Sequence, residues 1–482
     1  MTASGDTVLT RYHWAAGFIN GLIQAPPTPA PGTPMEEVRA RARARMDRLR
    51  AFLSVLGNPQ EQYRIAHIGG TSGKGSTAAM LAGVLHAAGY HTGLHISPYL
   101  QVETEKLQID GRLISGDRFA DYVEHIAAAM EEWTRAGGER LTYGEFWLSL
   151  VLWAFAQERV EWAVIEVGAG GRFDLTNVVF SDVAVITSVG IDHVATLGHT
   201  IPEIAWHKAG IIKPGRPAIT TVDDPAALEE IRREATEQDA PLTHLVPDRD
   251  FRVLASDASG TQVLDIPSGT VFHVPMPGEF QGANAAAAIA AARALRDLPR
   301  GPIDDAAIAA GLAATRFPGR MEVVQEHPRV VLDGAHNPEK MASLTRNLDR
   351  LGRPRRRIVV FGSLDSHDYL TNATLVAQAA DEVIVTTPVA TQRAAADARV
   401  LADAIIAAGT PADVVPEPRD AIVAALERAT PDDEIVATGS LYLVGAVREH
   451  WYRGDDIVLA CSSWPPRSSE HPHRGNGSRT GT

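Results

Sequence analysis

The chain has 482 residues, of which 45% are hydrophobic and 22% are charged, a balance typical of globular proteins rather than disordered or fibrous ones. This length favours two or three domains, because a single hydrophobic core rarely grows beyond about 300 residues. A formal net charge of −14 argues against nucleic-acid binding through a generally basic surface, although it is compatible with a local basic pocket for an anionic ligand.

Cysteine content and hydropathy favour a cytoplasmic protein. The single cysteine, Cys461, rules out an intramolecular disulfide framework and fits a reducing compartment. No apolar run approaches the roughly 20 residues that a membrane-spanning helix needs. The apolar segment Tyr12–Ile23 is short and no small-residue cleavage site follows it, so we interpret it as a helix rather than a signal peptide.

After this helix, the first predicted elements are a proline-rich connector and a second helix. QAPPTPAPGTP, residues 24–34, cannot be helical throughout, because proline lacks the amide hydrogen that a helix interior needs. Residues 35–57 have the spacing of a charged amphipathic helix that ends at Gly57. YRIAHI then has the composition of a strand, a glycine-rich loop follows, and residues 76–88 have helical apolar spacing.

Strand-length apolar runs alternate with helical segments along the next part of the chain. HTGLHIS, WAVIEVG, VAVITSVG and PAITTV are four such runs, and their alternation with helices predicts βαβ units and a largely parallel sheet. Residues 251–274 alternate around Gly and Asp turns, so we expect a small β-rich hairpin region there. NAAAAIAAARALRDL is predicted to be a buried helix.

A second α/β set begins after TRFPGR, with the runs RVVLDGAHNPEKMASL, RIVVFGSL, DEVIVTTP and DEIVATGSLYLVGAVREHW. We therefore predict an α/β protein with a domain boundary near Pro318, so that residues 1–317 form one domain and residues 318–456 a smaller one. The end of the chain is rich in Ser, Pro, Gly and Arg, and residues 457–482 are predicted to be a disordered tail.

The stretch IAHIGGTSGKGSTAAML, residues 65–81, has the features of a phosphate-binding loop. Its glycines let backbone N–H groups approach a phosphate, the following helix presents its positive end, and Lys74 adds a point charge. The usual loop places the magnesium-binding hydroxyl directly after the lysine, but Gly75 stands there and the hydroxyls follow at Ser76 and Thr77. A glycine-rich turn that serves only packing is the alternative; the flanking strand and helix favour phosphate binding.

Polar residues also mark three later strands. Because the carboxyl ends of parallel strands meet at one edge of a sheet, these side chains would face the same crevice as the glycine loop. Ser97 follows one run, and Glu166 lies inside another, where a buried carboxylate is costly unless it is paired or binds a metal. His193 follows a third run, and we interpret Glu166 and His193 as magnesium ligands. The alternatives are a simple Ser-Pro turn, a glutamate held by backbone N–H groups, and a structural histidine.

Residues further along the chain are weaker candidates on their own. Lys208 lies on a helix of mixed polarity, where the pattern alone favours a solvent-facing lysine. Arg320, Asp333 and His336 lie in PGRMEV and VVLDGAHNP, two more strands that lead into polar loops. An arginine and a carboxylate in such loops could clamp a triphosphate and a ribose hydroxyl, respectively.

Taken in order, these motifs resemble those of folylpolyglutamate synthase/dihydrofolate synthase, a branch of the Mur ligase superfamily. The segments that carry the resemblance are LGNPQ, HIGGTSGKGST, SPYL, TYGEFWLSLVLWAF, EVGAGGRFDLTN, ITSVGIDH, LGHTIPEIAWHKAGIIKPG, NAAAAIAA, FPGRMEV, LDGAHNP and TGSLYLVG. They run in family order from about residue 36 to residue 450, so only the two ends of the chain are left uncovered.

The resemblance implies a P-loop ATPase-like N-terminal domain and a smaller Rossmann-like, glutamate-ligase C-terminal domain, with the active site between them. In this family ATP, together with two magnesium ions, phosphorylates a carboxylate of a pteroate or folate substrate. The amine of L-glutamate then attacks the acyl phosphate and forms an amide. The family also suggests a monomer that acts on small molecules.

The resemblance further implies roles for individual residues. Those assigned to ATP are Gly73, Lys74, Gly75, Ser76, Asn284, Arg320 and Asp333, with His336 in the same loop as Asp333. Those assigned to magnesium are Ser97, Glu166, His193 and Lys208, the last as a carbamate formed with carbon dioxide. Lys74, Lys208 and His193 would be the catalytic residues. Because Gly75 carries no hydroxyl, the family match moves that magnesium contact to Ser97.

The chain departs from the family pattern at a few positions. Ser72 replaces the usual Asn of the loop, Tyr99 stands where His or Phe is common, and Gly144 replaces a frequent aromatic residue. The last two bear on substrate preference more than on the chemistry.

Two other functions are compatible with a nucleotide-binding loop. One is a Mur-type ligase that acts on a cell-wall precursor, but SPYL and EVGAGGRFDLTN follow the folate branch. The other is a nucleotide-binding protein without catalysis, which would have no need for Lys74, Glu166, His193 and Lys208 together.

Overall fold

The computed structural model describes residues 5–23, 32–295, 299–352, 354–365, 368–389 and 394–466. Most of the predicted proline-rich connector and the last part of the predicted tail therefore lie outside the described residues. Within these ranges, no helix is both long enough and apolar enough to cross a membrane.

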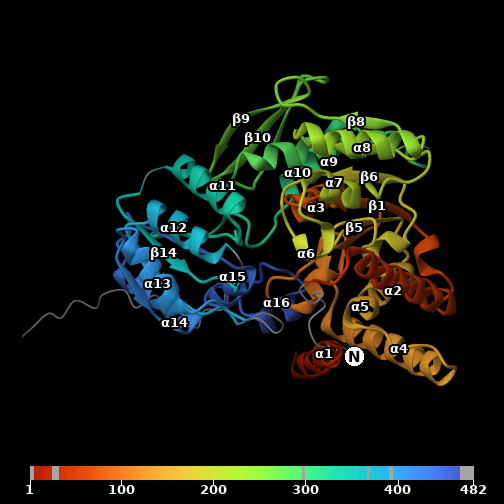
Figure 1. Ribbon diagram of the computed structural model, residues 1–482, viewed down its shortest axis with the longest axis horizontal. Coiled ribbons are helices and arrows are strands. Elements are labelled where there is room, and N and C mark those ends of the chain that lie inside the picture. Colours follow the sequence, from red (N-terminus) through yellow and green to blue (C-terminus); the bar gives the residue numbers. More distant parts are fainter. Residues whose placement is uncertain are drawn as a thin grey trace, which may run out of the picture.

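An eight-stranded sheet organises the N-terminal part of the molecule, in the order β4-β3-β2-β5-β1-β6-β7-β8 (Figure 1). Six of its strands run parallel, and β3 and β4 add an antiparallel edge. The central strands are apolar because helices cover both faces of the sheet. The strands are β1 (Arg64–Gly69), β2 (Thr92–His95), β3 (Gln108–Ile109), β4 (Arg112–Leu113), β5 (Trp162–Glu166), β6 (Val183–Ile186), β7 (Ala218–Thr220) and β8 (Leu242–His244).

Alternate residues of β1 point to opposite faces of this sheet, and each face has its own helices. Ile65 belongs to a core built by α1 (Gly5–Asn20), α2 (Met35–Val55), α4 (Gly116–Arg135) and α5 (Tyr143–Gln157). Ala66 and Ile68 belong to a core built by α3 (Lys74–Ala87), α9 (Phe280–Ala294) and α10 (Asp305–Ala314). Beside β6 and β7, a smaller core holds α7 (Ile201–Ala209) and α8 (Pro225–Glu237).

Residues 251–274 form a three-stranded antiparallel sheet, which confirms that the predicted region is rich in β-structure. The predicted alanine-rich helix is α9, and most of its residues are buried. Its small side chains let it pack between the main sheet and the small one, since it contacts β6, β7, β9 and β10. The strands of the small sheet are β9 (Phe251–Asp257), β10 (Gly260–Asp265) and β11 (Thr270–Val274).

A six-stranded sheet organises the C-terminal part, in the order β12-β13-β17-β14-β15-β16, and only β12 is antiparallel. The predicted α/β class is therefore confirmed for both parts of the chain. One face carries α11 (Pro338–Leu348), α12 (Tyr369–Ala379) and α13 (Ala398–Ala407), and the other carries α14 (Pro418–Arg428) and α15 (Leu441–Arg448). The strands are β12 (Glu322–Glu326), β13 (Arg329–Leu332), β14 (Arg357–Phe361), β15 (Glu382–Val385), β16 (Ala412–Val414) and β17 (Glu434–Thr438).

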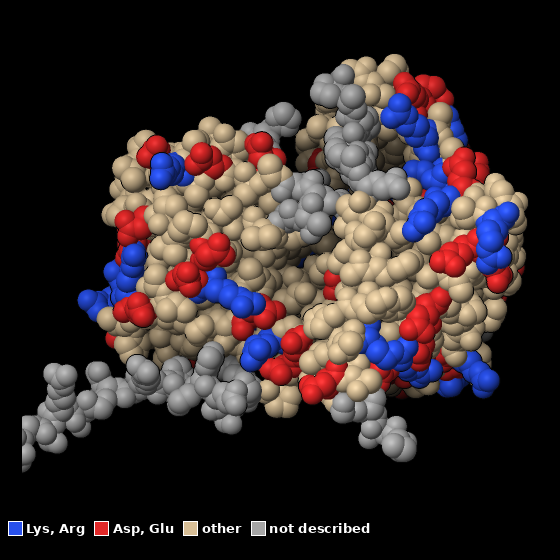
Figure 2. Space-filling model, turned by 90° about the horizontal axis from the view of Figure 1, so that it is seen from below, with Lys and Arg blue, Asp and Glu red and all other residues tan. Residues whose placement is uncertain are grey.

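The two sheets lie side by side in separate lobes, and the surface is hollowed between them (Figure 2). The glycine loop and Glu166 lie at the carboxyl edge of the N-terminal sheet, where β1 ends at Gly69 and β5 at Glu166. Ligands of open α/β folds bind at such edges, beyond the carboxyl ends of the strands.

The predicted disordered tail is wrong in its first part. Residues Gly454–Ala460 form α16, and its Ile457 and Val458 are buried in the core that contains α1 and α4. Beyond this helix, the indole of Trp464 donates a hydrogen bond to Glu322 at 2.9 Å. Through α16 the chain returns to the N-terminal domain after it completes the second sheet, and Trp464 then contacts β12 of that sheet. The sequence pattern missed α16 because its apolar run IVLA is short and stands among polar residues.

Candidate active site

The glycine loop joins β1, which ends at Gly69, to α3, which begins at Lys74. Gly70 and Gly73 have φ angles of 142° and 85°, a backbone conformation that favours glycine. A Cβ on Gly73 would collide with the side-chain amide of Asn284 on α9. The structure therefore brings Asn284, predicted to contact the nucleotide, against the loop predicted to hold the phosphates.

Side chains and backbone at the end of β6 hold this loop in place. The N–H groups of Thr71 and Ser72 donate to the carbonyl oxygen and Oγ of Ser188, each at 2.8 Å. Thr187 Oγ1 donates to the carbonyl oxygen of Ser72 at 2.6 Å. The ammonium of Lys74 lies 3.5 Å from the carbonyl oxygen of Thr71, and no carboxylate of the described residues forms an ion pair with it. The charge of Lys74 is thus free to meet a phosphate.

Glu166 is the last residue of β5 and lies next to this loop. Its Oε2 accepts a hydrogen bond from the backbone N–H of Ser97 at 2.8 Å and lies 3.3 Å from where a Cβ on Gly75 would be. Burial raises the pKa of Glu166, and the positive charges of Lys74 and Arg320 offset this only in part. Ser97, Glu166 and the loop therefore come together as expected. The backbone contact also matches the alternative interpretation of Glu166 as a carboxylate held by an N–H group.

Lys208 does not face the solvent, so the interpretation that the pattern alone favoured is wrong. The residue is 2% exposed, because α7 packs into the core beside β6 and α8. Burial, together with the nearby positive charge of Lys74, lowers the pKa of Lys208 to about 7, and the charge of Asp192 opposes this change. A substantial share of this amine is therefore neutral at physiological pH.

His193 begins α6 (Val194–Leu197) in a left-handed backbone conformation, with φ at 49°. Its Nε2 lies 3.8 Å from Oδ1 of Asp192, and its side chain is 42% exposed. Burial works against ionisation of Asp192, but the charges of His193 and Lys340 outweigh it and lower the pKa of that carboxyl. His193 is thus accessible to solvent. Its neighbour Asp192 interacts electrostatically both with His193 and with Lys340 of the second domain.

The predicted residues of the second domain cluster after β13. Asp333 is buried and accepts hydrogen bonds from the N–H groups of Met321 at 2.9 Å and Ala335 at 2.8 Å. Burial raises its pKa, and the charge of Arg320 counteracts the change. The ring of His336 bonds through Nδ1 to the carbonyl oxygen of Gly334 at 2.8 Å. Desolvation within the site lowers the pKa of His336 to about 4, and the charge of Lys340 acts in the same direction.

Lys340 is a residue of this site that sequence reasoning missed. It lies in the first turn of α11, and its ammonium is 3.2 Å from Nε2 of His336. Burial lowers its pKa to about 8, with the charge of Lys74 acting in the same direction. Its neighbour Glu339 lies close to the loop after β6, since a Cβ on Gly190 would be 2.8 Å from its carboxylate. The sequence did contain one signal for Lys340: it follows His336 by four residues where a helix begins, a spacing that can bring two side chains together.

The residues near the loop fit a magnesium ion that is shared with a nucleotide. Magnesium is usually held by one or two carboxylates together with substrate phosphates and water. Ser97 and Glu166 offer such oxygen atoms beside the glycine loop. Among the described residues, no three His, Cys, Asp or Glu side chains converge as a ready-made metal cluster. An ion here would therefore depend on the phosphates for much of its coordination.

Comparison with known proteins agrees with this geometry. The chain matches the Mur ligase middle domain over residues 68–292 and the Mur ligase, glutamate ligase domain over residues 319–441. Folylpolyglutamate synthase of Lacticaseibacillus casei is 37% identical over 411 residues, which cover 83% of this chain and 93% of that protein. Dihydrofolate synthase/folylpolyglutamate synthase of Escherichia coli (strain K12) is 33% identical over 404 residues, covering 84% and 90%.

The fold agrees as well. The solved structure of Mycobacterium tuberculosis folylpolyglutamate synthase complexed with ADP has a TM-score of 0.80 and 28% identity, covering 95% of this chain and 100% of that chain. The fold, the glycine loop and the matched domains define an ATP-dependent ligase of the Mur type. Within that class, the chain belongs to the family of folylpolyglutamate synthases and dihydrofolate synthases, and the resemblance of its motifs is confirmed.

Proposed function

We propose that the protein uses ATP to join L-glutamate to a carboxylate of a folate-type substrate. The observation that carries this proposal is the close approach of three groups that come from both domains. These are the glycine loop with Lys74, the Glu166–Ser97 pair beside it, and Arg320 with Lys340 from the second domain. The names of the related synthases give the substrate class.

The first step transfers the γ-phosphoryl group of ATP to the substrate carboxylate. Negative charge spreads over the oxygens of the transferred group, so the site needs fixed positive charges and N–H donors rather than a protein nucleophile. Lys74 and the N–H groups of Gly73, Gly75 and Ser76 would hold the phosphates. Bound magnesium, held by Ser97, Glu166 and His193, would neutralise part of the charge on the phosphates. Asn284 would contact the nucleotide from the N-terminal side.

Arg320, Asp333 and His336 would contact the nucleotide from the second domain. Arg320 supplies a guanidinium for the phosphates, and Asp333 a carboxylate for a ribose hydroxyl. Lys340, which faces Lys74 across the domains, would add a positive charge that the sequence pattern did not indicate. Bringing these groups onto the nucleotide would also close the site and keep water from the acyl phosphate.

Lys208 would act as a carbamate. The neutral amine adds to carbon dioxide, an N–C bond forms and a proton leaves, so that a buried cation becomes an anion. Its lowered pKa favours this reaction because only the neutral amine is a nucleophile. The carbamate would help to hold a second magnesium, which the ammonium would repel.

Several finer points belong to the same proposal. The enzyme would work as a cytoplasmic monomer on small molecules alone, with an ATP-binding domain over residues 1–317 and a glutamate-ligase domain over residues 318–456. Both extension of tetrahydrofolate and conversion of dihydropteroate to dihydrofolate are candidate activities, since the related proteins carry both names. In the second step of either reaction, the amine of L-glutamate attacks the acyl phosphate and releases phosphate.

The deciding experiment measures ADP release with ATP, magnesium and L-glutamate, plus either dihydropteroate or tetrahydrofolate. We expect release that requires L-glutamate with at least one of the two acceptors, and the pair separates the two activities. Product analysis should show an added glutamyl residue on the acceptor. Absence of turnover with both acceptors would contradict the proposal and return attention to cell-wall precursors as substrates.

A further inference from the structure

Lysine is rare in this chain, and every lysine is at least partly buried. Only five of the 45 Lys and Arg residues are lysines, and none of the five is exposed. Among the described residues, the exposed Lys and Arg side chains are therefore all arginines, and lysine is kept for particular positions. They are Lys74, Lys106, Lys208, Lys213 and Lys340.

Four of these lysines are already accounted for. Lys74, Lys208 and Lys340 surround the candidate active site, as described above. Lys213 donates a hydrogen bond to Oδ1 of Asn177 at 2.7 Å, so it has a structural partner. Lys106 remains without a role. It ends a short 3-10 helix, η2 (Glu103–Lys106), that follows the SPYL segment.

The ammonium of Lys106 is buried among aromatic rings and has no anionic partner. The residue is 7% exposed, and its Nζ lies 4.3 Å from the ring centre of Trp147 and 5.3 Å from that of Tyr143. No hydrogen-bond acceptor or carboxylate in the described part of the chain bonds to this atom. Ring faces attract a cation, but they do not replace its hydration as a carboxylate does.

Glu103 is the carboxylate whose charge acts on Lys106, and it is hydrogen-bonded to other groups. One carboxylate oxygen accepts hydrogen bonds from Asn20 at 3.0 Å and Tyr99 at 3.2 Å, and the other from Tyr12. The charge of Glu103 raises the pKa of Lys106, but burial is the larger effect and lowers it to about 7. The folded protein therefore buries an ammonium that has no ion-pair partner, at a cost in stability, while the carboxylate of Glu103 already has its hydrogen-bond donors.

This ammonium lies close to the boundary between the domains, in the segment that follows Ser97 of the candidate active site. Tyr99 comes two residues after Ser97, whose N–H bonds to Glu166. The charge of Tyr442 on α15, in the second domain, contributes to raising the pKa of both Tyr99 and Tyr143. None of the three tyrosines is fully buried, so the group of rings that covers Lys106 reaches the surface at the domain boundary.

We propose that Lys106 binds a carboxylate of a glutamate unit, supplied either by free L-glutamate or by the glutamyl end of the folate substrate. This proposal rests on the proposed function and names one side chain that recognises the substrate. A buried cation without a partner gains most from an anion that enters with the substrate, because both groups then lose their unpaired state. Lys106 acts in binding, and the reacting atoms lie at the glycine loop.

The test replaces Lys106 by Met, which keeps the length of the side chain and removes its charge. Steady-state kinetics would follow ADP release with L-glutamate and each acceptor in turn. We expect Lys106→Met to raise one KM by about 30-fold or more. The kcat value and the KM for ATP should stay within about threefold of those of the parent protein.

The pattern of KM values identifies the source of the carboxylate. A higher KM for L-glutamate with both acceptors indicates the free amino acid. A higher KM for tetrahydrofolate, with that for dihydropteroate unchanged, indicates the glutamyl end, because dihydropteroate has none. Lys106→Arg should restore part of the lost affinity in either case, since it restores the charge.

Thermal unfolding separates this role from a structural one. Lys106→Met should leave Tm unchanged or raise it, because the variant no longer buries an unpaired charge. Lys213→Met is the matched control: it removes a lysine that is hydrogen-bonded, so it should lower Tm and leave every KM unchanged. A lower Tm for Lys106→Met with unchanged KM values would overturn the proposal and make Lys106 a packing residue. A parent protein without turnover would instead contradict the proposed function.

Discussion

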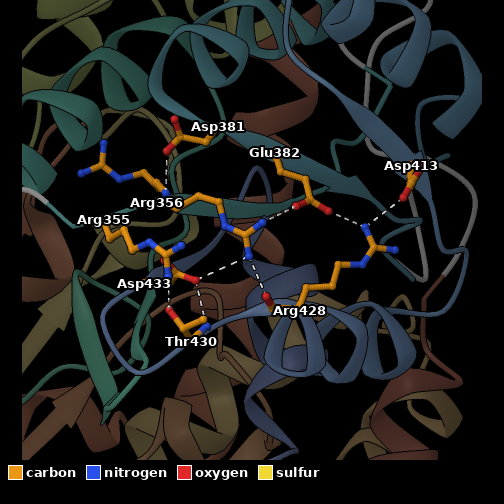
Figure 3. Close-up of polar contacts among 9 residues, drawn as sticks. Arg355, Arg356, Asp381, Glu382, Asp413, Arg428, Thr430 and Asp433 are labelled. Atoms are coloured by element: carbon orange, nitrogen blue, oxygen red, sulfur yellow. Dashed lines mark hydrogen bonds and ion pairs between the residues drawn. The ribbon is translucent and has the colours of Figure 1, made fainter.

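The six-stranded sheet has a densely paired group of charges at the amino ends of its strands (Figure 3). Arg356 bonds to Glu382 and Asp433, and Arg428 bonds to Glu382 and Asp413. Each guanidinium thus meets two carboxylates, and Glu382 bridges the two arginines. The charges tie the starts of β15, β16 and β17 to the end of α14.

The candidate active site, beyond the opposite ends of the strands, has the reverse arrangement. Lys74, Lys208 and Lys340 form no ion pair with a carboxylate of the described residues, and neither does Lys106. Unpaired charge costs stability, and the cost grows with burial. The contrast indicates that the paired group serves the fold, while the unpaired group awaits anionic ligands.

The largest effect that would test this contrast is expected at Lys208. Lys208→Ala removes the group that would become a carbamate, so glutamate-dependent ADP release should fall by about 1000-fold or more. Binding of ATP, measured by calorimetry with a non-hydrolysable analogue, should stay close to that of the parent protein. The parent protein should also lose activity in buffers depleted of carbon dioxide and regain it with bicarbonate. Near-normal turnover of Lys208→Ala would exclude the carbamate role.

Glu166→Gln should have the next largest effect. The amide keeps the shape of the side chain but loses its negative charge, so kcat should fall by about 100-fold. The magnesium concentration needed for half-maximal activity should rise, because a carboxylate binds magnesium better than an amide does. Magnesium titrations of the parent protein and the variant measure both effects. An unchanged magnesium requirement would favour the alternative in which Glu166 only accepts the N–H of Ser97.

The paired group should respond in the opposite manner. Arg356→Met removes the guanidinium between Glu382 and Asp433, and it should lower the stability by about 1 kcal/mol, because the arginine is partly exposed and screened by solvent. Denaturant unfolding measures this loss, which should shrink in high salt. All KM values and kcat should match those of the parent protein. A clear change in a KM value would mean that the two groups of charges are coupled through the sheet.

This contrast also explains which features the sequence could predict. The glycine loop, the strand-end positions of Ser97 and Glu166, and the β-rich region over 251–274 depend on local spacing, and local spacing is visible in a sequence. Their prediction needed only the rule that the carboxyl ends of parallel strands meet at one edge.

The burial of charges depends on residues that are distant in the sequence. Lys208 is buried on a helix that packs against α8 and β6, and its charged neighbours include Lys74 and Lys340, each more than a hundred positions away. Lys106 is covered by Trp147 and Tyr143, about forty positions further along. A single lysine in a helix of mixed polarity therefore suggested a solvent-facing side chain. The packing of Ile457 against α1 was missed for the same reason, since its partners lie at the other end of the chain.

The smallest expected effect is a pH dependence of stability that arises from Lys106. Its pKa is about 7 in the folded protein and 10.5 ordinarily, so between these values the unfolded chain holds a proton that the folded one has lost. Stability rises with pH wherever the unfolded state binds more protons. The penalty that Lys106 imposes is therefore complete below about pH 7 and fades as the pH approaches about 10.

The difference in Tm between Lys106→Met and the parent protein isolates this contribution. It should be largest near neutral pH, at a few degrees or less, and should narrow steadily as the pH rises. The neighbouring groups do not titrate in this window, because burial lowers the pKa of His95 to about 4 and raises that of Tyr143 to about 12. Glu103, which also faces Lys106, is present in both proteins. A difference in Tm that stays constant or widens over this range would show that the ammonium of Lys106 has a partner in the folded protein. Lys106 would then no longer belong to the unpaired group of charges, which would consist of Lys74, Lys208 and Lys340.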